Sequence, residues 1–217
     1  IMIKKTIGII GPGYHFEKNI ISILAKNSSL KISGILRNKK KKYKNYKTLS
    51  EDKFFKENFD FVYISCPNKL HEKYIIKSLK SGFHVICEKP FLTNGNKLKE
   101  ILFLSKKKKK LIFETFMHLY HPIFHKLKKL INEKKRGKLR YIVSNFRFPS
   151  LNKDNHRYKK KLGGGFFYDA AVYQLSVENY LFNNVSINKK KIEQIKIRRE
   201  VDLKGYFGIK NKSFHRF

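Results

Sequence analysis

Short apolar runs alternate with amphipathic segments through the first half of the chain. The runs are rich in β-branched and aromatic residues and occupy residues 6–10, 30–36, 61–65, 83–87 and 111–115. Runs of this length and composition are typical of strands that a parallel sheet buries on both faces. The segments between them repeat apolar residues with helical spacing. The alternation predicts an α/β unit built on a doubly wound parallel sheet.

The clearest predicted helix follows the strand at residues 61–65. Pro67 and Asn68 end that strand, and Gly82 stands where a left-handed C-terminal cap belongs. One stripe of the helix carries Leu70, Tyr74, Ile75 and Leu79. Ser50 and Asn94 are expected to cap two further helices of the same unit.

The strand at residues 83–87 leads directly into Glu88, Lys89 and Pro90. These three residues lie just past the carboxyl end of the strand, where open α/β sheets bind ligands. Pro90 restricts the backbone after the charged pair. We therefore expect Lys89 to project into a ligand cleft.

A dinucleotide-binding turn follows the first strand and reads Gly11-Pro12-Gly13-Tyr14-His15-Phe16. Gly11 permits the tight turn, and Gly13 lets the backbone approach a pyrophosphate that the free amides of the helix N-terminus stabilise. The third glycine of the G-x-G-x-x-G pattern, which allows close packing of helix on strand, is replaced by Phe16. The position of the motif directly after an N-terminal strand favours its interpretation as a dinucleotide-binding turn.

Arg37 and Asn38 follow the strand at residues 30–36, where a Rossmann domain that binds NAD usually has an acidic residue. An arginine at this place can pair with a 2′-phosphate. We therefore predict a preference for NADP(H), with NAD(H) possible. The alternative is that Arg37 only begins the basic run that ends at Lys42.

The two motifs at the ends of neighbouring strands resemble the glucose-fructose oxidoreductase and inositol dehydrogenase family, written Gfo/Idh/MocA. That family has a P-N-x-x-H loop followed by an E-K-P motif, here Pro67, Asn68 and His71 and then Glu88, Lys89 and Pro90. The resemblance implies a Rossmann domain at residues 1–117. It also implies a substrate and oligomerisation domain at 118–217, an incomplete α+β unit with an open, mostly antiparallel sheet. The cofactor contacts it implies are Gly11, Gly13, Tyr14, His15, Arg37, Cys66, Pro67, Asn68, His71, Glu88 and Lys89.

A second signature begins at the glycines of residues 163–165 and continues into a helix. Asp169 and Tyr173 are neighbours there at i, i+4. In the family that this chain resembles, the helix faces the nicotinamide and carries an Asp and then a His or Tyr at these positions. Tyr173 is typical of the branch that contains sugar-nucleotide ketoreductases. For an isolated tyrosine, a core position with a satisfied hydroxyl would be the alternative.

The resemblance implies an NAD(P)-dependent oxidoreductase that moves a hydride between nicotinamide and a hydroxyl or keto carbon of a sugar or sugar nucleotide. Tyr173 would be the general acid or base. Lys89 would be the cation that assists it and holds the developing alkoxide, and Asp169 would orient the sugar or the tyrosine. The resemblance does not identify the sugar or the direction of the reaction.

His118, His121 and His125 lie close together after the last strand of the first unit. His121 and His125 would share a helix face at i, i+4, which raises the hypothesis of a metal site. No H-E-x-x-H pattern and no third ligand at suitable spacing accompany them, so we expect no metal. The resemblance instead implies that Tyr120 and His121 line the substrate side of the cleft.

The net charge of +34 raises the hypothesis of a protein that associates with nucleic acid. The lysine runs fall at predicted loops and element ends, however, and lysine is enriched together with Ile, Asn, Phe and Tyr, which all have AT-rich codons. Solvated lysines from a biased genome therefore explain the charge better. The runs are at residues 39–42, 106–110, 159–161 and 189–191.

Cys66 and Cys87 are the only cysteines and form no C-x-x-C pair, which indicates a reducing cytoplasm. No apolar run reaches 18 residues, so we expect no membrane span. Two strands are expected at residues 139–148 and 191–199, and a third at 201–207. Relatives in the family continue beyond this point with more sheet, so we expect a truncated chain. Its partners would be a small sugar substrate and, for the full-length family, further copies of itself. A non-catalytic dinucleotide-binding remnant is the remaining alternative.

Overall fold

The computed structural model describes residues 4–37, 43–133, 151–152, 154–165 and 167–182, together with four two-residue strands beyond them. The chain divides into two compact units, Ile1–Thr115 and Phe116–Phe217. Each unit is described by itself below.

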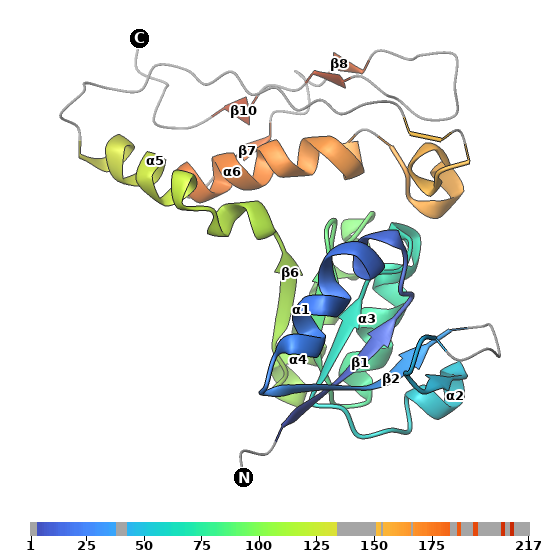
Figure 1. The fold of residues 1–217 in the computed structure, drawn as a ribbon. Coiled ribbons are helices and arrows are strands. Elements are labelled where there is room, and N and C mark those ends of the chain that lie inside the picture. The colour runs from blue at the N-terminus through green and yellow to red at the C-terminus, as the bar shows by residue number, and fades with distance from the viewer. Residues whose placement is uncertain are drawn as a thin grey trace. The chain divides into compact units, whose positions relative to one another are not determined.

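The first unit contains a six-stranded sheet of order β3-β2-β1-β4-β5-β6, in which every pair of neighbours is parallel (Figure 1). This arrangement confirms the predicted Rossmann sheet, with the change of direction in strand order next to β1. The strands are β1 (Lys5–Ile10), β2 (Leu30–Leu36), β3 (Thr48–Leu49), β4 (Phe61–Ile64), β5 (His84–Glu88) and β6 (Ile112–Thr115).

The helices of the first unit connect these strands. They are α1 (Ile21–Lys26), α2 (Glu51–Phe54), α3 (His71–Lys80) and α4 (Leu98–Lys108). Gly82 has φ of +83° after α3, which confirms the predicted cap. Asn94 accepts a hydrogen bond from the Asn96 amide, as a cap should. Ser50 occupies the N-cap position of α2, but its side chain makes no capping bond.

Two hydrophobic clusters cover the opposite faces of the sheet because successive strand residues point to opposite sides. One cluster joins β1 and β4 to α2, α3 and α4, with Ile10, Phe54, Ile64, Leu79 and Ile101 among its buried members. The other joins them to α1, with Ile9, Phe16, Ile21 and Tyr63. Burial on both faces accounts for the continuous apolar runs in the sequence.

Phe16 takes the place of the third glycine and is fully buried. Its ring lies 5.8 Å from the ring of Tyr63, between centroids. The chain from Phe16 to Ile20 forms a π-helical turn before α1 begins. The helix thus packs on the sheet through a large aromatic side chain, where the usual pattern has a close glycine contact.

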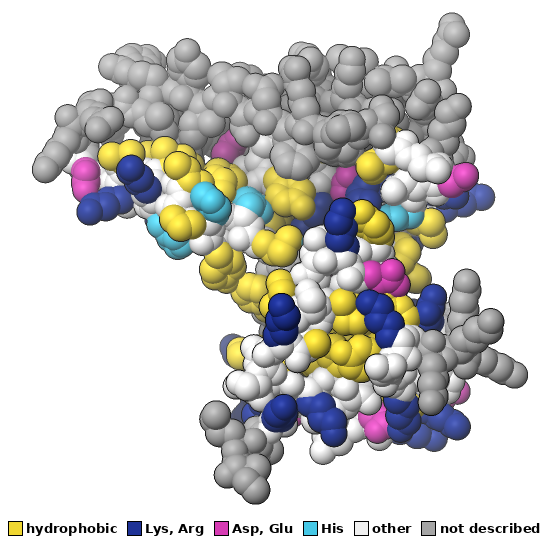
Figure 2. Space-filling view, in the orientation of Figure 1, with side chains coloured by type: hydrophobic (Ala, Val, Ile, Leu, Met, Phe, Trp, Pro, Cys, Tyr) yellow, Lys and Arg dark blue, Asp and Glu magenta, His cyan; other side chains and the backbone are white. Residues whose placement is uncertain are grey.

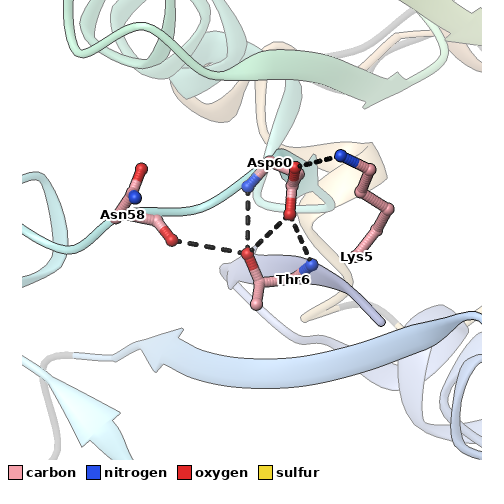
Figure 3. A network of polar contacts seen from close by, with 4 residues as sticks. All are labelled: Lys5, Thr6, Asn58 and Asp60. Atoms are coloured by element: carbon pink, nitrogen blue, oxygen red, sulfur yellow. Dashed lines mark hydrogen bonds and ion pairs between the residues drawn. The ribbon is translucent and has the colours of Figure 1, made fainter. Parts of the chain in front are cut away.

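A network at the amino ends of the strands ties β1 to the residue before β4 (Figure 3). Asp60 accepts hydrogen bonds from the Thr6 amide at 2.8 Å and the Thr6 hydroxyl at 3.0 Å. Lys5 Nζ lies 2.9 Å from the same carboxylate. The Thr6 amide and the Lys5 ammonium lower the pKa of Asp60 to about 2. This network fixes the register of β1 against β4 at the edge opposite the predicted cofactor turn.

The described helices of the second unit are α5 (Pro122–Asn132) and α6 (Val172–Phe182), and a π-helical turn at Phe167–Ala171 precedes α6. Antiparallel pairs join β7 (Ser186–Ile187) to β10 (Ile209–Lys210) and β8 (Glu193–Gln194) to β9 (Gly205–Tyr206). The predicted strand at residues 139–148 lies outside the described residues. The open antiparallel sheet therefore stays a prediction.

No helix in the described part of the chain is both long enough and apolar enough to cross a membrane.

Candidate active site

The turn after β1 is locked against the loop after β4. Gly11 has φ of +65°, and a Cβ added there would lie 2.4 Å from the Cβ of Cys66. Ser65 donates a hydrogen bond from its hydroxyl to the carbonyl oxygen of Gly11 at 3.1 Å. Glycine is required at this position by both the backbone conformation and the close contact.

Gly13 has a different environment. A Cβ added there would meet no atom within 4 Å, and its carbonyl oxygen accepts the Glu17 amide at the start of the helix. Crowding by the described residues therefore does not explain a glycine at this position. An open backbone at a helix N-terminus fits a phosphate group that must approach closely.

Glu88 joins the end of β5 to two neighbouring elements. The hydroxyl of Tyr63 donates a hydrogen bond to its carboxylate, and His15 Nε2 lies 3.8 Å from the same oxygen. His15 belongs to the predicted cofactor turn, and its Nδ1 lies 3.1 Å from the Asn19 side-chain amide. The structure therefore brings the turn and the E-K-P motif together, as the sequence predicts. Tyr63 was not among the predicted site residues.

His71 is fully buried at the start of α3. Its Nδ1 lies 2.8 Å from the carbonyl oxygen of Pro90, and its Nε2 lies 2.8 Å from that of Cys66. Burial lowers the pKa of His71, and these carbonyl contacts oppose that shift. The side chain thus ties the loop after β4 to the loop after β5. This position supports a role in holding the loops, and the predicted cofactor contact of His71 stays a prediction.

Glu114 in β6 is the second residue that the sequence did not single out. Its Oε1 accepts a hydrogen bond from the Phe91 amide at 2.7 Å, and it pairs in register with Cys87 of β5. Burial raises the pKa of Glu114, while the Phe91 amide and the nearby Lys89 act in the opposite direction. A charged residue inside the apolar run at 111–115 was the signal that could have identified it.

Lys89 follows β5 directly, and its peptide bond to Pro90 is cis. The β5 strand pairs with β4 and β6 along Ile64, Cys87 and Glu114, so Lys89 leaves the sheet at its carboxyl edge. Pro67 and Asn68 leave β4 at that same edge, where Asn68 begins a 3-10 turn before α3. The structure places the two sequence motifs on adjacent strands.

Arg37 lies at the end of β2 with its guanidinium carbon 5.0 Å from the ring centroid of Tyr43. Tyr43 is buried and donates a hydrogen bond from its hydroxyl to Glu17 at 2.7 Å. Glu17 stands in the first helical turn after Gly13. The aromatic ring and the helix therefore hold the arginine beside the predicted cofactor turn. Asn38 lies outside the described residues.

The two cysteines are buried thiols of the core. Burial raises the pKa of the Cys66 thiol to about 12 and raises that of Cys87 well above its ordinary value. Neither thiol is therefore activated as a nucleophile. Cys66 contributes its backbone, which contacts Gly11 and His71. Tyr14 lies at the surface, 73% exposed, at the start of the helix.

In the second unit, the carboxylate of Asp169 accepts a hydrogen bond from Arg157 Nε at 2.9 Å. The turn that holds Asp169 is π-helical and α6 begins at Val172, and the predicted i, i+4 pairing of Asp169 with Tyr173 stays a prediction. The ring of Tyr173 lies edge-on to that of His118 at 4.9 Å between centroids. His118 Nε2 in turn lies 2.8 Å from the hydroxyl of Ser176.

The remaining histidines have structural contacts. His121 is the N-cap of α5, where its Nδ1 accepts the Ile123 amide at 3.2 Å. It stands outside the helix, so it does not share a helical face with His125, whose Nδ1 lies 2.7 Å from the Tyr180 hydroxyl. Tyr120 is 65% exposed. Among the described residues, no group of three His, Cys, Asp or Glu side chains is placed to hold a metal.

The described lysine runs lie where the sequence placed them. Residues 106–110 form the end of α4 and the turn after it, and residues 159–161 form the start of a 3-10 turn, Lys160–Leu162, and the residue before it. On the face shown in Figure 2, the basic side chains of the first unit are spread among neutral and apolar ones. This distribution does not favour a nucleic-acid surface. The other two runs fall outside the described residues.

Comparisons with known families identify the class of protein to which this chain belongs. The profile of the oxidoreductase family with an NAD-binding Rossmann fold, GFO_IDH_MocA, matches residues 5–116. The profile of the GFO/IDH/MocA C-terminal domain matches residues 124–196. The chain belongs to the GFO/IDH/MocA oxidoreductase family.

Curated relatives in this family act on sugars and related diols, according to their names. A dTDP-3,4-didehydro-2,6-dideoxy-alpha-D-glucose 3-reductase from Actinomadura kijaniata is 29% identical over 55% of this chain and 36% of its own length. A trans-1,2-dihydrobenzene-1,2-diol dehydrogenase from Xenopus laevis is 23% identical over 77% of this chain and 49% of its own. A D-xylose 1-dehydrogenase (NADP(+)) 2 from Haloferax volcanii is 28% identical over 62% and 40%. The chain spans less than half the length of these relatives.

Solved structures show the same fold. KijD10, a 3-ketoreductase from Actinomadura kijaniata in complex with NADP and TDP-benzene, has a TM-score of 0.89 at 21% identity, covering 97% of this chain and 67% of its own. An aldose-aldose oxidoreductase from Caulobacter crescentus has a TM-score of 0.79 at 22% identity, covering 90% and 62%.

Proposed function

We propose that this chain is the cofactor-binding and catalytic part of an NAD(P)-dependent oxidoreductase. The enzyme would move a hydride between the nicotinamide and a hydroxyl or keto carbon of a sugar or sugar nucleotide. The observation that carries the proposal is the arrangement of the loops at the carboxyl edge of the sheet. There, β1 leads into a locked turn at Gly11 and an open backbone at Gly13, and β5, separated from β1 by β4, leads into Lys89. Family membership supplies the class of reaction.

The residues of the turn fit a dinucleotide. Gly13 leaves room for a pyrophosphate at the helix N-terminus, where free backbone amides would bind it. His15 lies in that turn and contacts Glu88. Asn68 lies in the loop that follows β4. The cofactor, once bound, supplies the hydride chemistry. The protein's task is then to hold the nicotinamide against the substrate and to manage the proton.

The proposed cofactor is NADP(H), with NAD(H) as the weaker ligand. Arg37 supports this preference because its guanidinium stacks on Tyr43 at the end of β2, and a fixed guanidinium suits bidentate contact with a phosphate. The names of the Haloferax relative and of the KijD10 complex also contain NADP.

Proton transfer is assigned to Tyr173, with Lys89 as the cation that holds the substrate oxygen. Asp169 is held by Arg157, and His118 contacts the Tyr173 ring. These contacts would keep the helix end in one arrangement. Tyr120 and His121 are proposed on the substrate side. Lys89 belongs to the first unit and Tyr173 to the second, so their meeting is part of the proposal.

The proposed division of labour follows the two units. Residues 1–117 would bind the dinucleotide, and residues 118–217 would contact substrate and further copies of the chain. A sugar nucleotide is the preferred substrate class because the Actinomadura relative is named as a reductase of a dTDP-linked sugar. The reducing cytoplasm is the proposed compartment, since both cysteines are unpaired.

The proposal is tested with Lys89→Ala and Tyr173→Phe, assayed with NADPH and a panel of keto-sugar nucleotides. Each variant should lose about 100-fold or more in kcat, the usual contribution of a positioned acid or base. The Kd for NADPH should change by less than about threefold, because neither side chain is assigned to the pyrophosphate or the 2′-phosphate. Lys97→Ala, an exposed lysine on the same unit, is the control. Full turnover in both variants would refute the assignment.

A further inference from the structure

Glu114 is a carboxylate near the carboxyl ends of the strands, where Lys89 follows β5. It lies in β6, one strand beyond β5, and its register partner is Cys87. Lys89 follows Cys87 by only two residues. The carboxylate is partly buried, so its interactions are less weakened by solvent than those of a surface pair.

The contact that Glu114 makes is with the backbone just after Lys89. The Phe91 amide donates to its Oε1 at 2.7 Å. On the preceding residue, the carbonyl oxygen of Pro90 faces His71 Nδ1 at 2.8 Å. Side chains from two different elements, α3 and β6, therefore hold the carbonyl and the amide of one peptide group, the group that joins Pro90 to Phe91. The chain that leaves Lys89 has little freedom to move.

Charge adds to this geometry. Burial raises the pKa of Glu114, and the positive charge of Lys89 acts in the opposite direction by favouring the ionised carboxylate. Burying a carboxylate is costly unless a hydrogen bond and an opposite charge compensate for it. The Phe91 amide provides the bond and Lys89 provides the charge. An alanine or leucine would fill the strand position with no such cost, so packing alone does not explain this residue.

We propose that Glu114 is a positioning residue of the candidate site. Its carboxylate fixes the backbone after Lys89 and supplies the negative charge that holds the lysine's ammonium in place. This inference rests on the function proposed above, because the position of Lys89 affects turnover only in that reaction. The contacts themselves can be tested without any turnover.

Two substitutions separate the bond from the charge. Glu114→Gln keeps an oxygen that can accept the Phe91 amide and removes the charge, whereas Glu114→Ala removes both. Glu100→Gln is the matched control, because Glu100 is an exposed carboxylate of α4 paired with Lys97 at 2.8 Å. All variants are made in the full chain.

The first readout is hydrogen exchange of the Phe91 amide, measured by NMR. Exchange should be slow in the unmodified chain and in Glu114→Gln, and at least about tenfold faster in Glu114→Ala. Equal exchange in all three would overturn the proposed bond.

The second readout is the rate at which Lys89 reacts with acetic anhydride, followed by mass spectrometry of the peptide that contains it. Acylation requires access to the Lys89 amine, and an ion pair with Glu114 would hold that amine away from the reagent. The rate should rise at least about threefold in Glu114→Gln and stay unchanged in Glu100→Gln. An unchanged rate in Glu114→Gln would overturn the proposed charge pairing.

The third readout is turnover. Glu114→Gln should lower kcat about tenfold, an effect of about 1.4 kcal/mol on the barrier, with the Kd for NADPH unchanged. Undiminished kcat in an active enzyme would overturn the inference. If the unmodified chain shows no turnover at all, the function proposed above fails, and the exchange and acylation measurements still decide whether Glu114 holds Lys89.

Discussion

The two edges of the six-stranded sheet are built in different ways. At the amino edge, Lys5, Thr6 and Asp60 form a partly exposed network that fixes the register of two strands (Figure 3). At the carboxyl edge, buried polar side chains hold loops in place, and one glycine lies in a left-handed conformation. Polar groups therefore stabilise strand pairing at one edge, and at the other they hold the loops that follow β4 and β5.

The largest expected effect on folding is at the carboxyl edge. Gly11→Ala places a Cβ where the Cβ of Cys66 already lies and forces alanine to φ of +65°. The free energy of unfolding should fall by about 3 kcal/mol, measured by urea denaturation. Gly95→Ala is the control, since a Cβ there meets nothing within 4 Å. An equal, small loss in both variants would contradict the close packing of the turn.

The preference for NADPH over NADH provides a second test at the carboxyl edge. Arg37→Asp should shift the ratio of NADPH to NADH affinity at least about tenfold toward NADH, because a charge-assisted hydrogen bond contributes about 1.5–3 kcal/mol. Fluorescence titration with both cofactors measures the ratio. Lys26→Asp makes the same change of charge on an exposed lysine of α1 and should leave the ratio unchanged. An unchanged affinity ratio in Arg37→Asp would contradict the proposal that Arg37 contacts the 2′-phosphate.

The smallest effect is at the amino edge. Asp60→Asn should lower the free energy of unfolding by about 1 kcal/mol at neutral pH without changing turnover. The pKa of Asp60 falls from 3.8 to about 2 on folding, so its ionised form stabilises the fold above pH 3.8. That contribution is lost as the pH falls through about 2.

The stability difference between Asp60→Asn and the unmodified chain should therefore shrink steadily below about pH 4. Urea denaturation at several pH values measures it, with Asp52→Asn, an exposed carboxylate of α2, as the control. A difference that stays constant with pH would show that the Asp60 charge has no part in strand pairing.

The strands and α3 could be predicted from the sequence because a parallel sheet buried on both faces requires continuous apolar runs. The predicted cap at Gly82 and the nearness of the two motifs also follow from local pattern, and the structure confirms both. The sequence showed that Phe16 replaces the third glycine of the motif, but it could not show how the helix packs on the sheet without that glycine. A buried ring and a π-helical turn are outcomes of packing between distant residues.

The predicted site was incomplete for a related reason. Tyr63 and Glu114 lie within strands, and their polar groups act on segments distant in sequence. A strand pattern shows which positions are buried and does not show what a buried hydroxyl or carboxylate will meet. Likewise, the partner of Asp169 is Arg157, which regular helical spacing could not indicate.

The central claim is that the open backbone at Gly13 receives the pyrophosphate of a nicotinamide dinucleotide. The most direct measurement is the Kd for NADPH of Gly13→Val, compared with Gly95→Val, because neither substitution meets a neighbouring atom at Cβ. Gly13→Val should fold with an unchanged melting temperature and bind NADPH at least about tenfold more weakly. Gly95→Val should bind it normally. NADPH affinity in Gly13→Val equal to that of the unmodified chain would contradict the account.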